Sequence, residues 1–120
     1  MRKSQTDSKW KDVRRYSRSS QGYKVKIKKD GIPLDITDWT IYFILKNNMN
    51  DNDSEALINK KITNHSNPTN GESLITFTVD EMDRVGSYYY SVDYKDNNNN
   101  EDVLVHGRME FEAIVRKIRD

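Results

Sequence analysis

The chain has no cysteine, only two prolines and five glycines, and no long apolar run. The absence of cysteine excludes disulfide bonds, thiolate metal sites and thiol nucleophiles. No apolar stretch approaches the roughly 20 residues that cross a bilayer as a helix. The basic N-terminus, residues 1–5, also lacks the apolar segment of a signal peptide. We therefore expect a protein that is made in a cytoplasm, without a membrane helix or a secretory leader.

Hydrophobic residues are also scarce, at 34% against 32% charged residues in a chain of 120. That length fits one domain, and a domain of this size leaves much of its surface in contact with water. Such a chain can fold alone, but it gains stability by burying surface against a partner.

The two signs of charge are unevenly distributed along the chain. Residues 1–20 hold seven basic and two acidic residues, a net charge of +5, whereas residues 21–120 carry −4. Apolar residues are sparse in the first segment and fit no helical face. We therefore expect an extended basic N-terminal arm over 1–20, ordered only by contact, and a folded domain over 21–120.

Alternation of apolar and polar residues predicts strands from residue 21 onward. Residues 23–28 alternate apolar residues with Lys, the pattern of a strand with one buried face. Residues 39–45 are apolar on both faces, as in a central strand. Further strands are expected near 56–62, 74–79, 88–94 and 103–115. Short strands separated by turn residues, with no amphipathic helix, predict an all-β fold, a small antiparallel immunoglobulin-like β-sandwich.

Aromatic residues are expected to determine this fold, namely Trp39, Phe43, Tyr88 and Phe111. Tyr88 begins a strand, where immunoglobulin-like domains place a corner tyrosine whose hydroxyl bonds the backbone upstream. Gly107 interrupts the last strand, as a β-bulge would.

Large apolar residues also fall on the faces opposite the expected core, namely Tyr42, Ile44, Leu74, Tyr89 and Leu104. Exposed apolar groups that gather on one face mark an interaction surface. These residues therefore predict a surface that a partner covers, unless they pack under loops.

Residues that could carry catalysis are few and scattered. His65 lies in a polar loop and His106 on a strand face opposite the core, so we expect both to be exposed and without a catalytic role. The chain has no G-x-S-x-G elbow, glycine-rich phosphate loop or carboxylate pair in an apolar setting. We therefore expect neither enzymatic activity nor a cofactor.

The candidates for a calcium site are two acidic loop clusters, with Asp51, Asp53 and Glu55 in one and Asp96, Glu101 and Asp102 in the other. The first cluster lacks the Gly and the final Glu of an EF-hand. Solvated acidic side chains are the better interpretation of both, so we expect no metal site.

The basic arm has three possible roles. The first is an anchor on an acidic neighbour, with contacts from Trp10, Arg14, Arg15, Tyr16 and Arg18. The second is a solvated tail, the usual state of a polar terminus. The third is contact with nucleic acid, which is least favoured because the acidic body would repel a duplex.

Four segments, taken in order, resemble one family. Residues 31–43 resemble the G-x-P-x-D-L-T-G-W-x-V-x-F stretch in the N-terminal domains of phage baseplate upper proteins and related tail proteins. Residues 60–71 are similar to their K-x-I-T…H-x-x-P-x-x-G segment. Residues 86–92 resemble their P-G-x-Y-Y-Y-D-I strand, and residues 107–111 their closing G-x-F-x-V strand.

The resemblance covers about residues 21–115, with Asp38 in place of the usual Gly and no Pro before Gly86. It implies an immunoglobulin-like domain in a virion, made in the host cytoplasm, present in several copies and bound to other virion proteins. Members often continue into a fibre or receptor-binding region that this sequence does not include. The resemblance therefore favours an adaptor or decoration subunit of a tail, baseplate, neck or capsid. The alternative is a carbohydrate or cell-surface binding module.

Overall fold

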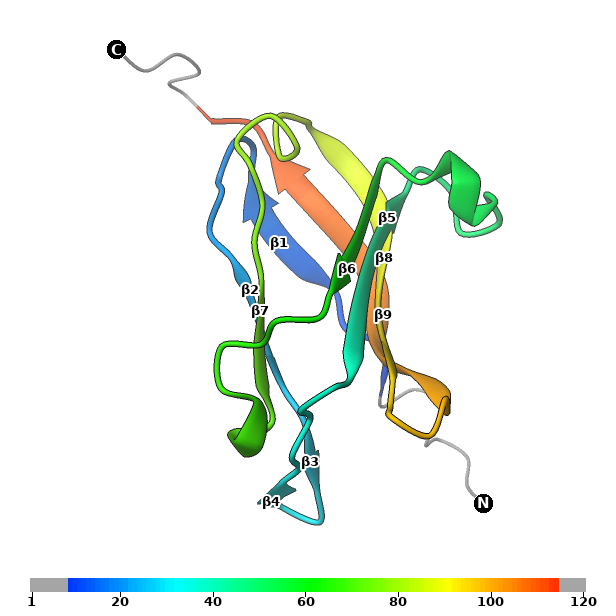
Figure 1. Cartoon of the computed structure of the whole chain (residues 1–120). Coiled ribbons are helices and arrows are strands. Elements are labelled where there is room, and N and C mark those ends of the chain that lie inside the picture. Colours follow the sequence, from blue (N-terminus) through cyan, green and yellow to red (C-terminus); the bar gives the residue numbers. More distant parts are fainter. Residues whose placement is uncertain (1–8, 115–120) are drawn as a thin grey trace.

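The computed structural model describes residues 9–114, which form two facing β-layers (Figure 1). The first layer is a five-stranded sheet in the order β1-β9-β8-β5-β6. Its strands are β1 (Val13–Tyr16), β5 (Thr40–Lys46), β6 (Ile58–Ile62), β8 (Gly86–Lys95) and β9 (Glu101–Glu112). The second layer is the antiparallel pair β2 (Tyr23–Lys26) and β7 (Glu72–Ile75). The prediction of an all-β fold is confirmed.

Short elements connect these strands. A small hairpin of β3 (Lys28–Lys29) and β4 (Ile32–Pro33) lies at one end of the molecule (Figure 1). Two 3₁₀ turns, η2 (Asp53–Glu55) and η3 (Pro68–Asn70), lie in the loops before β6 and β7. The order of β6, β5, β8 and β9 in one layer, with β2 and β7 in the other, is compatible with an immunoglobulin-like sandwich. That finer assignment stays a prediction.

The core lies between the two layers and follows the alternation in the sequence. In β5, Ile41, Phe43 and Leu45 are fully buried, and β5 lies inside the sheet between β8 and β6, as expected for a central strand. Phe111 is buried too, whereas Trp39 and Tyr88 are half-buried at the core's edge.

Both half-buried aromatic residues pack on another ring at that edge. Trp39 stacks on Tyr94 with ring centroids 5.0 Å apart. Tyr88 packs edge-on against Phe111, and its hydroxyl donates to the carbonyl oxygen of Val85 at 3.3 Å. That bond to upstream backbone is the contact expected of a corner tyrosine.

The N-terminal segment differs from the prediction of an arm ordered only by a partner. β1 pairs in parallel with β9 and is the edge strand of the five-stranded sheet, so residues 13–16 belong to the sandwich. The backbone ladder with β9 and the packing of Val13 against the core hold this segment, and ion pairs with acidic residues of β9 add to them. Lys9 pairs with Asp102 at 3.3 Å, and Arg14 pairs with Glu112. The part of the predicted arm in residues 1–8 lies outside the described residues.

Gly107 does not mark the bulge in β9, as the sequence had suggested. The register shifts where Val92 pairs with Val105 but Asp93 pairs with Val103, so Leu104 is the extra residue. An extra residue reverses the alternation of faces, and Leu104 packs against the core instead of facing outward. Glycine at position 107 serves another purpose, because the backbone of Lys11 lies directly against it. A Cβ there would lie 2.2 Å from the backbone oxygen of Lys11.

Candidate functional site

The outward side of the five-stranded sheet collects the side chains that the core does not use. Cross-strand register places Tyr42 beside Asp93 and Ile44 beside Ser91, and both pairs face away from β2 and β7. We call this surface the outer face, and its central residues are Trp10, Tyr42, Ile44, Lys46, Met49, Tyr89, Ser91, Asp93 and His106. The structure thus brings together three of the five apolar residues expected outside the core.

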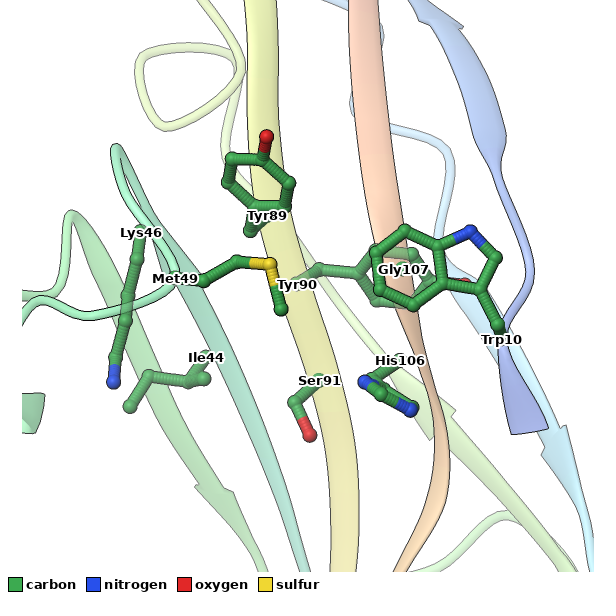
Figure 2. Close-up of a pocket in the computed structure, with 9 residues that line it drawn as sticks. All are labelled: Trp10, Ile44, Lys46, Met49, Tyr89, Tyr90, Ser91, His106 and Gly107. Atoms are coloured by element: carbon green, nitrogen blue, oxygen red, sulfur yellow. The ribbon is translucent and has the colours of Figure 1, made fainter. Parts of the chain in front are cut away.

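One half of the outer face is apolar. Its residues line a hollow of about 120 Å³. Figure 2 shows Trp10 and His106 on one side of this hollow and Met49, Ile44 and Tyr89 toward the other. Trp10 and Met49 are 40% and 55% exposed. Sequence reasoning assigned Trp10 to an arm and did not single out Met49, although Met49 is the only large apolar residue of the polar loop 47–54.

Backbone pairing holds Trp10 on the sheet. Trp10 forms a parallel bridge with His106, and its ring lies edge-on to the imidazole at 5.2 Å. The amide of Lys11 donates to the carbonyl oxygen of His106 at 2.8 Å. The hydroxyl of Tyr90 in turn donates to the carbonyl oxygen of Lys11 at 2.7 Å. Burial raises the pKa of Tyr90, so this hydroxyl remains a donor.

The other predicted anchor residues lie in different surroundings. Arg15 points inward, donates to the carbonyl oxygens of Ser19 and Gln21, and lies over the ring of Phe77 at 5.4 Å. Burial lowers the pKa of the Arg15 guanidinium.

Arg18 also makes a contact within the chain. It forms an ion pair with Asp83 at 3.0 Å in the turn after β1. Arg14 and Tyr16 face outward from β1 and are exposed. Of the five predicted anchors, Trp10, Arg14 and Tyr16 are therefore available at the surface, while Arg15 and Arg18 hold the segment in place.

The other half of the outer face carries charged side chains of both signs, since the register places Lys61 opposite Tyr42 and Lys95 opposite Glu101. Asp53, Asp93 and Glu101 line a hollow of about 510 Å³ beside Tyr42 and Ile44. Burial raises the pKa of Asp93, and the nearby charges of Asp53 and Glu101 add to the shift, whereas the hydroxyl of Ser91 opposes it by donating to the carboxylate.

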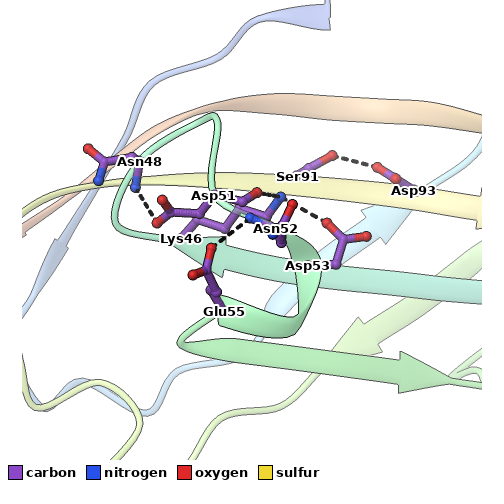
Figure 3. A network of polar contacts seen from close by, with 8 residues as sticks. All are labelled: Lys46, Asn48, Asp51, Asn52, Asp53, Glu55, Ser91 and Asp93. Atoms are coloured by element: carbon purple, nitrogen blue, oxygen red, sulfur yellow. Dashed lines mark hydrogen bonds and ion pairs between the residues drawn. The ribbon is translucent and has the colours of Figure 1, made fainter.

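Among these charged residues, Lys46 is held by the loop that follows β5. The ammonium of Lys46 pairs with Asp53 at 2.8 Å and also donates to the carbonyl oxygen of Asp51 at 2.8 Å (Figure 3). Lys46 is thus occupied by the loop, and the charge of Asp93 lacks an ion-pair partner among residues 9–114.

The acidic loops bind their own backbone. In the first loop, Asp51 accepts from the amide of Asn48 at 3.1 Å, and Glu55 accepts from the amide of Asn52 at 3.0 Å (Figure 3). In the second, Asp96 accepts from two amides of the asparagine run, each at 2.9 Å. Between residues 9 and 114, no three His, Asp or Glu side chains are grouped as a metal ion would need.

The two histidines are half-buried, which corrects the expectation that they are exposed. His65 lies between the start of β5 and strand β7. Its Nε2 donates to the carbonyl oxygen of Trp39 at 2.8 Å. Its Nδ1 lies 2.9 Å from the hydroxyl of the buried Ser73. The loop around His65 is polar in sequence, but it folds back on the start of β5 and on β7. His106 is covered by Trp10.

Comparisons with known proteins identify a family for the chain. Residues 9–114 contain no helix long and apolar enough to cross a membrane. The model of one protein family, the BppU N-terminal domain (baseplate upper protein), matches residues 1–116 and confirms the resemblance found in the sequence. No curated protein matches the chain.

One similar solved structure is the "N-terminal domain of phage TP901-1 ORF48", with a TM-score of 0.48 and 12% identity over 85% of this chain and 81% of that one. The match to the family model covers nearly the whole sequence. The chain therefore belongs to the family of phage baseplate upper protein N-terminal domains and is a virion component.

Proposed function

We propose that this protein is a structural adaptor subunit of a phage baseplate or tail. It acts by binding neighbouring virion proteins through the outer face, and its role is mechanical and not catalytic. Membership of the baseplate upper protein family supports the location. The observation that carries the proposal is the exposed apolar half of the outer face.

That apolar half has the composition of a protein interface. Trp10 and Met49 are exposed and line one hollow together with half-buried Tyr89 and Ile44. Aromatic residues and Met are enriched at interfaces, and large exposed apolar groups rarely gather on one face of a protein without a partner. A neighbouring protein that covers this hollow would remove the largest apolar side chain of the N-terminal segment from water.

The outward residues of β1 extend the same surface to the edge of the sheet. Arg14 lies beside Glu110, and Tyr16 lies beside Glu112 in the parallel register. We infer that Arg14 and Tyr16 contact the same neighbour as Trp10, while Arg15 contributes indirectly by fixing β1 against Phe77. The predicted anchor thus acts from a strand of the sandwich.

A double variant, Trp10→Ala with Met49→Ser, tests this role. Loss of a central Trp commonly costs 2 kcal/mol or more of binding, so we expect affinity for the neighbouring virion protein to fall roughly 30-fold or more. Incorporation into particles, measured by quantitative mass spectrometry, should fall in parallel. Circular dichroism and thermal melting report whether the sandwich remains folded.

Two further variants make the test decisive. Met49→Ser alone changes an exposed loop residue and leaves the pairing of Trp10 intact, so it should reduce incorporation without lowering stability. Ile32→Ser is the matched control, because Ile32 is 67% exposed but lies on the β3–β4 hairpin. Wild-type incorporation of the double variant would contradict the proposal. Binding of the wild-type domain to a glycan array would favour the carbohydrate-binding alternative.

A further inference from the structure

We propose that the charged half of the outer face holds a binding site for a neutral glycan, as in a segment of a cell-surface polysaccharide. The site is the hollow of about 510 Å³ over Tyr42 and Ile44, which we call the sheet hollow. This activity goes beyond the proposed function, which depends on the neighbouring hollow beside Trp10. A domain that binds another virion protein through one half of a face can still hold a sugar on the other half.

The sheet hollow crosses four strands of the five-stranded sheet. Asn59 lines it from β6, Tyr42 from β5, Asp93 from β8 and Glu101 from β9. Its volume lies within the roughly 300–1,000 Å³ of small-ligand sites. Register places Tyr42 directly opposite Asp93, and side chains opposite each other on one face lie close together. The aromatic ring and the carboxylate therefore border the same part of the hollow.

Charges of the two signs balance on this part of the sheet. Three carboxylates and three ammonium groups lie on it, those of Asp53, Asp93, Glu101, Lys46, Lys61 and Lys95. A surface without net charge gives no electrostatic advantage to a ligand of either sign. A polyhydroxylated neutral ligand suits such a surface, because its hydroxyl groups donate to carboxylates and accept from ammonium groups.

Asp93 explains why the ligand should offer hydroxyl groups. Its half-buried carboxylate has no ion-pair partner within residues 9–114, and the one side chain of that range that donates to it is Ser91. A carboxylate has about four acceptor sites, and a polar group taken from water without donors costs free energy. Two adjacent hydroxyls of a sugar can fill the unused sites of Asp93 with charge-assisted hydrogen bonds.

Tyr42 supplies the apolar surface that a sugar ring also needs. One face of many pyranose rings presents C–H groups, which pack on the electron-rich face of an aromatic ring. Tyr42 and Ile44 are half-buried at the floor of the sheet hollow, and the exposed side chains of Asn59 and Glu101 stand at its rim. An apolar floor with a few polar groups around it is the usual composition of a small-ligand site.

Glycan binding by the full chain tests this site. The probes are an array of neutral and phosphate-bearing polysaccharide fragments, followed by calorimetric titration of the neutral fragment that gives the strongest signal. We expect binding of neutral fragments with an affinity that changes less than about twofold as salt is raised, because an uncharged ligand forms no ion pair to screen. Preference for phosphate-bearing fragments, or no binding of neutral ones up to about 1 mM, would overturn the assignment.

Asp93→Asn separates a role in binding from a role in stability. The substitution keeps the size of the side chain but removes the charged acceptor, so affinity for the neutral fragment should fall about tenfold or more. Its melting temperature should not fall, because the half-buried charge is removed. Tyr42→Ala should weaken binding to a similar extent, whereas Tyr42→Phe keeps the ring and should bind within about threefold of the wild type.

Matched controls remove the same groups elsewhere. Asp30→Asn changes an exposed turn of the β3–β4 hairpin, and Tyr16→Ala an exposed position of β1, so both should bind the fragment as the wild type does. Equal weakening by these controls, or wild-type affinity in both Asp93→Asn and Tyr42→Ala, would overturn the assignment.

The Trp10 and Met49 double variant distinguishes this site from the proposed function. It should keep glycan binding and lose particle incorporation, whereas Asp93→Asn should do the reverse. Loss of glycan binding in the double variant but not in Tyr42→Ala would place the sugar in the other hollow, which would overturn the assignment and favour the carbohydrate-binding alternative to the adaptor role.

Discussion

The crossing of the N-terminal segment over Gly107 gives the sharpest prediction about this fold. In Gly107→Ala, the new Cβ would lie 2.2 Å from the backbone oxygen of Lys11 and 2.7 Å from its carbonyl carbon. Real Cβ contacts are not this short, and the atoms in the way are backbone. Residues 9–12 must therefore move away from the sheet, and with them the hydroxyl bond of Tyr90 to Lys11 is lengthened or lost.

The expected cost follows from these contacts. Overpacking of this kind typically costs 1–3 kcal/mol, and loss of one buried hydrogen bond costs about 1 kcal/mol. Alanine also lowers the conformational entropy of the unfolded chain relative to glycine, which offsets about 0.4–1 kcal/mol of this cost. We expect Gly107→Ala to lower the free energy of unfolding by about 2 kcal/mol, which urea denaturation followed by circular dichroism measures.

A second measurement separates local displacement from a general loss of stability. The rate of amide hydrogen exchange should rise most at Lys11 and along β1. Residues 9–12 immediately precede β1, so their displacement weakens its pairing with β9. Tyr90→Phe is the matched variant: it removes the same hydroxyl bond without the steric clash, and should cost only about 1 kcal/mol. Unchanged stability and unchanged β1 protection in Gly107→Ala would refute the reasoning, since both follow from the close approach of Lys11.

Two other substitutions have expected outcomes. Burial raises the folded-state pKa of Asp93, so the folded protein binds this proton more readily than the unfolded chain and loses stability as the pH rises through that range. Asp93→Asn should therefore raise the melting temperature at pH 7, with a gain that disappears as the pH falls below the unfolded-state pKa of about 3.9, and an unchanged melting temperature at pH 7 would contradict this. Gly71 has φ +73°, and its Cβ would lie 2.4 Å and 2.8 Å from the backbone oxygens of Ile27 and Leu34. Gly71→Ala should lower the unfolding free energy in urea by about 3 kcal/mol or more, and a loss under about 1 kcal/mol would exclude this contact.

The strands were predictable because their signal is local. Alternation along residues 23–28 identified β2, and the apolar run at 39–45 identified β5 as a central strand, with Phe43 buried as expected. The corner contact of Tyr88 was also expected, since a tyrosine at a strand start reaches only nearby backbone. Each of these predictions depends on residues within one turn or one strand.

The candidate site was predictable only in part. Tyr42, Ile44 and Tyr89 were assigned to outward faces correctly, because alternation in β5 and β8 is uninterrupted there. Leu104 was assigned wrongly, because the bulge shifts the register of β9 by one residue and no residue in the sequence identifies its position. Trp10 was seen as an anchor, but its place beside Met49 was not.

The sequence by itself determined the all-β class, the approximate positions of the main strands from residue 23 onward, the family and the excess of basic residues at the N-terminus. The tertiary structure decided where that basic segment goes. Arg14 finds its acidic partner 98 residues away, and Trp10 bridges to His106. The physical reason is that alternation and charge are properties of neighbouring residues, whereas the pairing of β1 with β9 depends on which distant strand offers a free edge and opposite charge. The outer face exists only once that pairing is made.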